Sequence, residues 1–139
     1  MSIKTGTYLI FSKDKNALVG RNMVETMDLR PKEIFSIPNG PAPPMWQIQQ
    51  NGNTYHLRNQ GAGATALSDR VLAVLLNEPA PDDWELKAHG DAYTIEKVDG
   101  SVCWSVGDED RGGLLQIEAK PIPQSPGPKE LFIFQALYG

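Results

Sequence analysis

Short runs of alternating apolar and polar residues, separated by turn-forming residues, extend along the whole chain. Thr7–Phe11, Glu33–Ile37 and Thr54–Arg58 are examples, and each is followed within a few positions by Pro, Asn or Asp. Alternation with a period of two is typical of strands that bury one face. Since no segment shows a sustained helical period with capping residues, we predict about twelve short strands and no long helix.

The strand pattern repeats at a fixed spacing. Asn39-Gly-Pro-Ala-Pro-Pro-Met-Trp46 is echoed by Asn77-Glu-Pro-Ala-Pro-Asp-Asp-Trp84, and a Tyr follows each Trp by nine residues. A third, more divergent copy is split between the two ends of the chain, with Phe132 in the place of the Trp. Internal repeats identify an architecture before any single element does. The sequence therefore predicts three units, bounded by Tyr8–Trp46, Tyr55–Trp84 and Tyr93–Phe132.

Three four-stranded units with an aromatic residue in the last strand predict an all-β fold, a pseudo-threefold β-trefoil. In this architecture six strands close into a barrel and three hairpins cap it, so no long sheet edge stays open. We expect one domain over residues 1–139, with repeats near 5–50, 51–88 and 89–139. Aromatic residues at equivalent positions are predicted to share the core: Tyr8, Trp46, Tyr55, Trp84, Tyr93 and Phe132.

Composition excludes several classes of partner. The net charge of −4 argues against a nucleic-acid partner, and the absence of a long apolar run argues against a membrane span. Cys103 is the single cysteine, so no internal disulfide is expected. Together with a start that lacks a secretion signal, this favours a cytoplasmic monomer, with secretion by a non-standard route left open.

No residue cluster predicts an enzyme, a metal site or a cofactor. His56 and His89 lie in different elements, and no hydrolase or zinc motif is present. Cys103 is interpreted as a small core residue. Asp108-Glu109-Asp110 lacks the spacing of a calcium loop and is interpreted as a solvated acidic turn.

The three units differ in length at one place above all. Tyr8 and Ile34 are 26 positions apart, whereas their counterparts Tyr55 and Leu72 are 17 apart, so unit one has nine extra residues. They fall in 22–32, between its second and third strands, and unit three has its own excess in 121–129. Extra length in a repeat projects outward, where binding residues are common, although a tolerated surface insertion remains the alternative.

Four short motifs are spread over the whole chain: Val19-Gly-Arg21, Glu25-x-x-x-Leu29-x-Pro31-Lys32, Pro44-x-Trp46-x-Ile48 and Glu130-Leu-Phe132-x-Phe134. Together they resemble the small mushroom serine protease inhibitors of the cospin family. The resemblance implies a disulfide-free β-trefoil that inhibits trypsin-like, chymotrypsin-like or subtilisin-like proteases. It also implies that the loop between the second and third strands binds the protease, here through Glu25, Thr26, Met27, Asp28, Leu29 and Arg30.

By position in this resemblance, Met27 falls where the trypsin-inhibiting member has a basic residue. Met27 is therefore our candidate for the residue that enters the specificity pocket. Its unbranched apolar side chain suits chymotrypsin-like, elastase-like or subtilisin-like pockets, whereas trypsin's buried carboxylate requires Lys or Arg. Arg30 stays open as an alternative, although Pro31 follows it. Lys129, in a loop that a relative is thought to use, is a candidate for a second protease contact.

An inhibitor of this kind binds as a substrate that does not leave. Its loop pairs in extended form with the enzyme, and a rigid scaffold reduces the entropy lost on binding. The alternative function is that of a carbohydrate-binding β-trefoil lectin. Lectins of the ricin-B type carry a Gln-x-Trp motif in each unit, and that motif is absent from all three units here.

Overall fold

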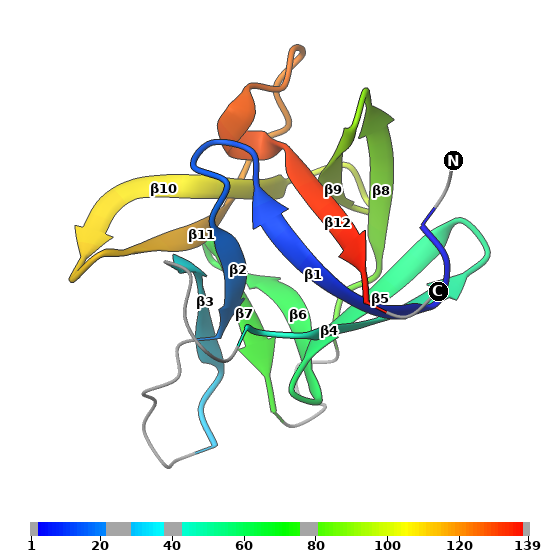
Figure 1. Cartoon of the computed structure of the whole chain (residues 1–139), viewed down its shortest axis with the longest axis horizontal. Helices are drawn as coiled ribbons and strands as arrows, with labels where there is room; N and C mark the ends of the chain where they lie inside the picture. The colour runs from blue at the N-terminus through cyan, green and yellow to red at the C-terminus, as the bar shows by residue number, and fades with distance from the viewer. Residues whose placement is uncertain (1–2, 22–28, 38–42, 76–80, 138–139) are drawn as a thin grey trace.

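A closed ring of six antiparallel strands forms the centre of the computed structural model, which describes residues 3–21, 29–37, 43–75 and 81–137. Each strand of the ring pairs with the next, and the last pairs with the first (Figure 1). In ring order the strands are β1 (Gly6–Ser12), β4 (Trp46–Asn51), β5 (Thr54–Asn59), β8 (Trp84–His89), β9 (Ala92–Lys97) and β12 (Phe132–Ala136). Closure leaves these strands without an open edge.

Three hairpins cover one end of the ring and pair with one another. They are β2 (Leu18–Arg21) with β3 (Lys32–Ile37), β6 (Ala62–Leu67) with β7 (Arg70–Val74), and β10 (Cys103–Arg111) with β11 (Leu114–Lys120). The second strand of each hairpin also pairs with the second strands of the other two, which closes a triangular cap. A six-stranded ring capped by three hairpins is a β-trefoil, as the repeat predicts.

Strand pairing confirms the three units. Tyr8 lies directly opposite Trp46, Tyr55 opposite Trp84, and Tyr93 opposite Phe132. Each unit thus begins and ends with aromatic residues that face each other across neighbouring strands of the ring. Five of these six residues are buried, but Tyr93 is only half-buried and packs its ring edge-on against Phe134.

One more aromatic residue, Trp104, occupies the middle of the core, and the repeat does not predict it. The Trp104 ring lies 5.6 Å from Trp46, 5.7 Å from Trp84 and 5.9 Å from Phe132, centroid to centroid. These are favourable distances for tilted and edge-on aromatic pairs. The indole Nε1 atoms of Trp46 and Trp84 donate to the carbonyls of Val19 and Ala64, in the first strands of their hairpins. By strand register, Trp104 is the unit three equivalent of Val19 and Ala64. The centre of the core is therefore filled by a large side chain from one unit only.

Two details of the sequence interpretation are wrong. The buried counterpart of Ile34 is Val71 and not Leu72, because Ile34 pairs with Arg21 and Val71 with Ala66, each two positions after the carbonyl that binds the Trp. The predicted acidic turn at 108–113 is mostly strand, since β10 continues to Arg111 through an irregular register and the turn itself is Gly112–Gly113. In Figure 1 this long hairpin extends from one side of the molecule. Asp108, Glu109 and Asp110 are exposed, as a solvated interpretation requires.

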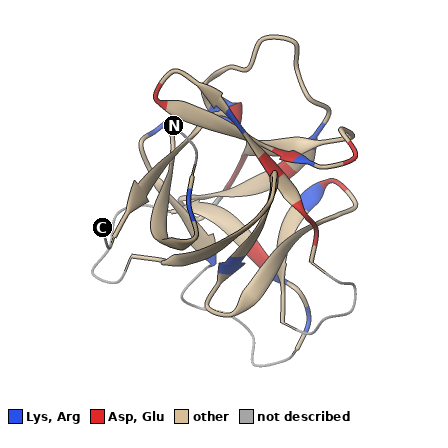
Figure 2. Cartoon of the chain, turned by 90° about the vertical axis from the view of Figure 1, so that its right-hand side faces the viewer, with Lys and Arg blue, Asp and Glu red and all other residues tan. Residues whose placement is uncertain are grey.

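Charged residues are mixed over the surface. Figure 2 shows Lys and Arg interspersed with Asp and Glu along the strands rather than gathered on one face. The described residues hold no group of three or more His, Cys, Asp or Glu placed to bind a metal ion. Within the same part of the chain, helices with the length and apolar character needed to cross a membrane are absent.

Candidate functional site

The longest connection within a hairpin lies between β2 and β3. Ten residues, 22–31, separate these strands, whereas two residues separate β6 from β7 and two separate β10 from β11. Counted between the paired positions Arg21–Ile34 and Ala66–Val71, unit one exceeds unit two by eight residues at this hairpin, one fewer than the sequence suggested. The insertion is therefore where the repeat comparison placed it.

The described part of this loop is solvent-exposed. Leu29 has 64% of its surface exposed, and Arg30 and Pro31 are exposed as well. An apolar side chain with this exposure is suited to contact another molecule. Glu25, Thr26, Met27 and Asp28 lie outside the described residues. Arg21 ends β2 and Lys32 begins β3 on the two sides of the loop, and both are buried.

Asn59, a fully buried polar residue, holds the first end of the loop. Its Oδ1 accepts a hydrogen bond of 2.9 Å from the main-chain N–H of Arg21, and its Nδ2 donates one of 2.8 Å to the carbonyl of Met45. The Arg21 guanidinium donates in turn to the carbonyls of Asn59 and Gln60, at 3.3 and 3.4 Å. We call this set of contacts the Asn59 clasp. It ties the end of β2 to the end of β5 and to the segment before β4.

A close contact between Gly20 and Pro44 lies beside the clasp. A Cβ atom on Gly20 would lie 2.3 Å from the Pro44 Cβ, a separation that real Cβ atoms do not show, and 3.4 Å from the Asn59 Oδ1, which is van der Waals contact. Gly20 is therefore needed for this close approach of the two segments and not for a special φ angle. At the base of the loop the end of β2 and the segment before β4 are thus in direct contact.

The other end of the loop is held by strand pairing. Lys32 and Glu33 at the start of β3 pair with Ala73 and Leu72 of β7. Glu33 also forms an ion pair with Arg70, in which Nη1 and Oε2 lie 3.7 Å apart. Further along β3, Gln116 of β11 donates from Nε2 to the Ile34 carbonyl at 3.2 Å. Both ends of the loop thus start from paired strands.

The second loop predicted to contact a protease contains Lys129, which lies in a single 3₁₀ turn, η1 (Pro128–Glu130). Lys129 Nζ is bonded to the Asp108 carboxylate on β10. This bond holds the pKa of Asp108 below its ordinary value and the pKa of Lys129 above it. Lys129 must therefore leave an ion-pair partner before it can enter a protease pocket.

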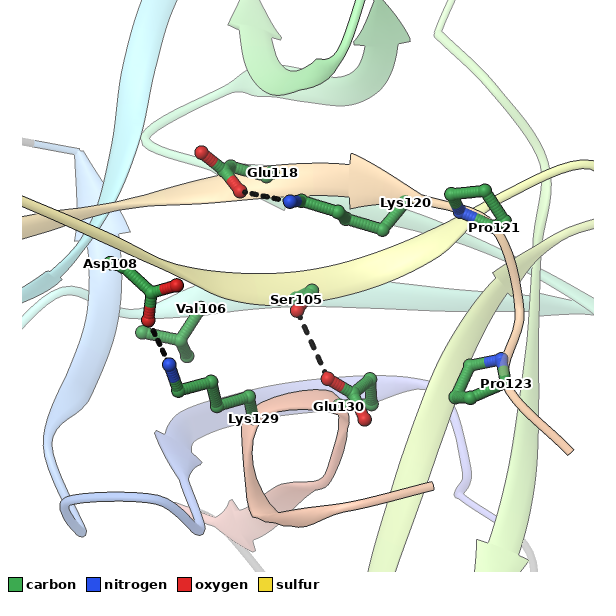
Figure 3. A pocket seen from close by; sticks show the side chains of 9 residues that line it. All are labelled: Ser105, Val106, Asp108, Glu118, Lys120, Pro121, Pro123, Lys129 and Glu130. Atoms are coloured by element: carbon green, nitrogen blue, oxygen red, sulfur yellow. Dashed lines mark hydrogen bonds and ion pairs between the residues drawn. The ribbon is translucent and has the colours of Figure 1, made fainter. Parts of the chain in front are cut away.

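A shallow hollow of about 320 Å³ separates η1 from the β10–β11 hairpin (Figure 3). Its charged groups are matched internally: besides the Lys129–Asp108 pair, Lys120 pairs with Glu118 at 3.2 Å, and Ser105 Oγ donates to Glu130 at 3.1 Å. In Figure 3 the two Lys side chains point toward these carboxylates. Because each of these charges has a partner within the protein, the hollow offers no charge that calls for a ligand.

Cys103 carries no reactive thiol. Its side chain is fully buried between strands, and this burial raises its thiol pKa to about 12. Since the thiolate is the nucleophile, a thiol with so high a pKa is inert at neutral pH. The interpretation of Cys103 as a core residue agrees with its burial.

Asn59 was not identified from the sequence. It ends a strand just before the Gln60-Gly61 turn, where Asn is common for local reasons. The available signal was its position, because Asn59 lies opposite Trp46, while Lys97 and Ser12 lie opposite the equivalent Trp84 and Phe132. Only Asn59 of the three has an amide, whose separate oxygen and nitrogen accept and donate at once, and a comparison of lengths cannot detect this difference between units.

Comparison with known proteins gives one family and several similar structures. The model of a family described as peptidase inhibitor I66 matches residues 1–136 of this chain. A serine protease inhibitor from Lentinula edodes is 36% identical over 77 residues, which are 55% of this chain and 53% of that protein. The match thus spans about half the length of this curated relative.

Among solved structures, a proteinase inhibitor from Coprinopsis cinerea superimposes with a TM-score of 0.86 at 26% identity, covering 98% of this chain and 100% of that one. The Rhizoctonia solani agglutinin superimposes with a TM-score of 0.79 at 13% identity, covering 98% of each chain. At this low identity the second similarity shows the fold alone.

Proposed function

The chain belongs to the peptidase inhibitor I66 family, and from this membership we propose that it inhibits serine proteases through the loop of residues 22–31. The family consists of protease inhibitors rather than enzymes, which agrees with the prediction that this protein is not an enzyme. The observation that carries the proposal is the ten-residue connection between β2 and β3, where the equivalent hairpins have two residues.

Substrate-like binding requires a loop that is accessible in its middle and fixed at its ends. Leu29, Arg30 and Pro31 are exposed, which supports accessibility. The Asn59 clasp on one side and the pairing of β3 with β7 on the other support fixed ends. A protease that cuts such a loop would leave both new ends attached to the barrel, so that rejoining competes with release.

Met27 is proposed as the residue that enters the specificity pocket. This assignment rests on the family resemblance, and it favours chymotrypsin-like, elastase-like or subtilisin-like enzymes over trypsin-like ones. The exposed Leu29 is compatible with an apolar binding surface beside that pocket. Arg30 is the basic alternative within the loop, and it is followed directly by Pro31, which restricts the backbone on its C-terminal side.

The proposal is tested by inhibition assays against trypsin, chymotrypsin, elastase and subtilisin. The decisive variant replaces residues 22–33 by Leu-Ser-Asp-Arg, the segment 67–70 that connects the same paired positions in unit two. We expect this variant to fold, since the graft uses a connection the fold already contains, and to lose inhibition. Met27→Asp should weaken inhibition of any enzyme with an apolar pocket, and Met27→Arg should shift inhibition toward trypsin.

Lys129→Ala is the matched control in the second loop. It removes the Asp108 ion pair without touching residues 22–31, so inhibition should be unchanged if a single loop acts. Full inhibition by the loop-replacement variant would overturn the proposal. Loss of inhibition of one protease by Lys129→Ala alone would assign a second site to η1. A glycan array with clear binding, and no inhibition in the panel, would favour the lectin alternative instead.

A further inference from the structure

The three hairpins are fastened to the barrel in two different ways. Two positions before the aromatic residue that ends each unit stand Pro44, Asp82 and Glu130. In unit two, Asp82 Oδ2 accepts a hydrogen bond of 2.7 Å from the main-chain N–H of Ala66. In unit three, Glu130 Oε2 accepts from Ser105 Oγ. These two carboxylates each bind the first strand of their own hairpin.

Pro44 has no side-chain acceptor, so unit one needs another group at this place. The main-chain N–H of Arg21 is equivalent to that of Ala66, because Arg21 pairs with Ile34 as Ala66 pairs with Val71. It donates instead to Oδ1 of Asn59 on β5, the ring strand that pairs with β4. Asn59 then binds the Met45 carbonyl, the residue between Pro44 and Trp46. The fastening of unit one therefore runs through β5 and reaches the following unit.

From this difference we infer that Asn59 is the positioning residue of the protease-binding loop: it fixes the point at which the loop leaves β2. The inference rests on the proposed function of that loop. Asn59 uses both ends of its amide, and the Arg21 guanidinium binds the carbonyl of Asn59 itself. Replacing the Asn59 side chain thus removes the acceptor of the Arg21 main-chain N–H, whereas the guanidinium of Arg21 keeps the main-chain carbonyl of residue 59 as its partner.

The clasp bears on inhibition and not only on folding. A substrate-like loop inhibits when its two ends stay in place, because binding then costs little entropy and a cut can be reversed. The unit two hairpin has a connection of two residues, which cannot move far whatever holds its base. The ten-residue connection of unit one magnifies any movement of Arg21. Equal losses of contact should therefore have unequal consequences in the two units.

The test compares Asn59→Ala with two other variants. Asp82→Ala removes the acceptor of the equivalent N–H in unit two, that of Ala66, and Asn59→Asp keeps the acceptor for the Arg21 N–H. The first readout is amide hydrogen exchange, measured by mass spectrometry on peptides covering residues 19–31, which include the Arg21 amide. We expect exchange in these peptides to accelerate in Asn59→Ala, by about 10-fold or more at Arg21, the factor that corresponds to the loss of its one buried hydrogen bond to Asn59. Asp82→Ala should leave these peptides unchanged, and Asn59→Asp should fall between Asn59→Ala and the wild type.

The second readout is inhibition of whichever panel protease the wild type inhibits, together with the rate at which that protease cuts the loop. Asn59→Ala should raise the inhibition constant about 10- to 100-fold and turn the inhibitor into a substrate that is cut and released. Asp82→Ala should lose comparable thermal stability but keep the wild-type inhibition constant.

Unchanged exchange over residues 19–31 in Asn59→Ala overturns the inference, and so does an equal rise of the inhibition constant in Asp82→Ala. If the wild type inhibits no protease, the proposed function fails by itself. The exchange measurement then still decides whether Asn59 positions the loop, so the two failures are distinguishable.

Discussion

At the scale of single residues, the core contains three indole rings that differ in whether their Nε1 atom has a hydrogen-bond partner. Trp46 and Trp84 each donate an Nε1 hydrogen bond to a carbonyl of their own unit. Trp104 contacts both rings, but its Nε1 has no hydrogen-bond partner among the described residues although it is fully buried. Burying an unpaired N–H has a cost, which the packing of three aromatic neighbours must offset.

Trp46→Phe and Trp104→Phe should therefore differ in their effect on stability. Both remove a similar ring volume from the core, so the cavity contribution is similar. Only Trp46→Phe breaks a hydrogen bond, whereas Trp104→Phe removes an unpaired donor. We expect Trp104→Phe to be less destabilising by about 1–3 kcal/mol in urea unfolding. Equal unfolding midpoints for the two variants would show that the buried N–H of Trp104 carries no cost.

Cys103 provides a prediction on pH. Burial raises its thiol pKa to about 12 from an ordinary value of 9.0. For a group whose pKa is raised in the folded state, the contribution to stability is complete below the unfolded value and declines as the pH rises toward the folded one. We expect stability to fall between pH 9 and 12, and to fall less steeply in Cys103→Ala.

At pH 8 the native thiol should not react with a disulfide reagent and should react fully after unfolding. If the thiol of the native protein reacted as fast as that of the unfolded protein, the interpretation of Cys103 as an inert core residue would be contradicted.

At the scale of elements, the packing of a connector against a hairpin depends on two glycines. A Cβ on Gly20 would lie 2.3 Å from Pro44, and a Cβ on Gly63 would lie 2.4 Å from Pro81. Gly20→Ala and Gly63→Ala should each destabilise the protein by about 1–3 kcal/mol, measured by urea unfolding. Gly6→Ala serves as the control, because its nearest neighbour would be 3.6 Å away.

The two glycine variants should separate in inhibition assays. Gly20 adjoins Arg21 and lies beside the Asn59 clasp, so displacement of Pro44 should disturb the base of the loop and weaken inhibition. Gly63 belongs to the hairpin with the short connection, and Gly63→Ala should keep the wild-type inhibition constant. Weaker inhibition in both variants would mean that general loss of stability, and not the position of the loop, determines inhibition.

Most elements could be predicted from the sequence because their signals are local. Alternation, turn residues and the Trp-centred repeat predict about twelve strands, and the part of the chain that the structure describes has twelve; the alternating run Glu33–Ile37, for example, lies in β3 (Lys32–Ile37). Turn chemistry was less reliable. Asn51-Gly52 has the composition of a two-residue hairpin turn, but the turn is Gly52–Asn53, since Asn51 still pairs with Thr54 and Gly52 has a φ of 64°. A positive φ at the first of two turn residues is typical of a type II′ turn.

The candidate site could be predicted only as far as chain length reveals it. Unequal spacing located the insertion in 22–32, which differs by one residue from the connection 22–31 between β2 and β3. The fastening could not be predicted, because Asn59 acts on a residue 38 positions away through pairing that exists only in the closed ring. The role of Met27 rests on resemblance and remains a prediction.

At the scale of the whole molecule, the closed ring places the first and last strands of the chain next to each other. β1 and β12 lie side by side over five paired positions, and Leu137 N donates to the Thr7 carbonyl at 2.9 Å (Figure 1). The start of β1 and the end of β12 are thus adjacent in space, although they are far apart in the sequence. Residues before β1 are also attached, since Tyr55 donates from its hydroxyl to the Ile3 carbonyl.

A circular permutant should therefore fold and inhibit. Its ends would be joined by a flexible Gly/Ser linker from residue 137 to residue 3, and it would be opened in the exposed turn at Asp99–Gly100, between β9 and β10. Exposed turns tolerate such openings because few contacts are lost. We expect a β-rich circular dichroism spectrum, a modest loss of thermal stability and the wild-type inhibition constant, because residues 22–31 and the Asn59 clasp are untouched. A second permutant, opened within 22–31, should fold equally well and lose inhibition. If the first permutant folds but does not inhibit, the activity depends on more of the chain than one loop on a closed scaffold.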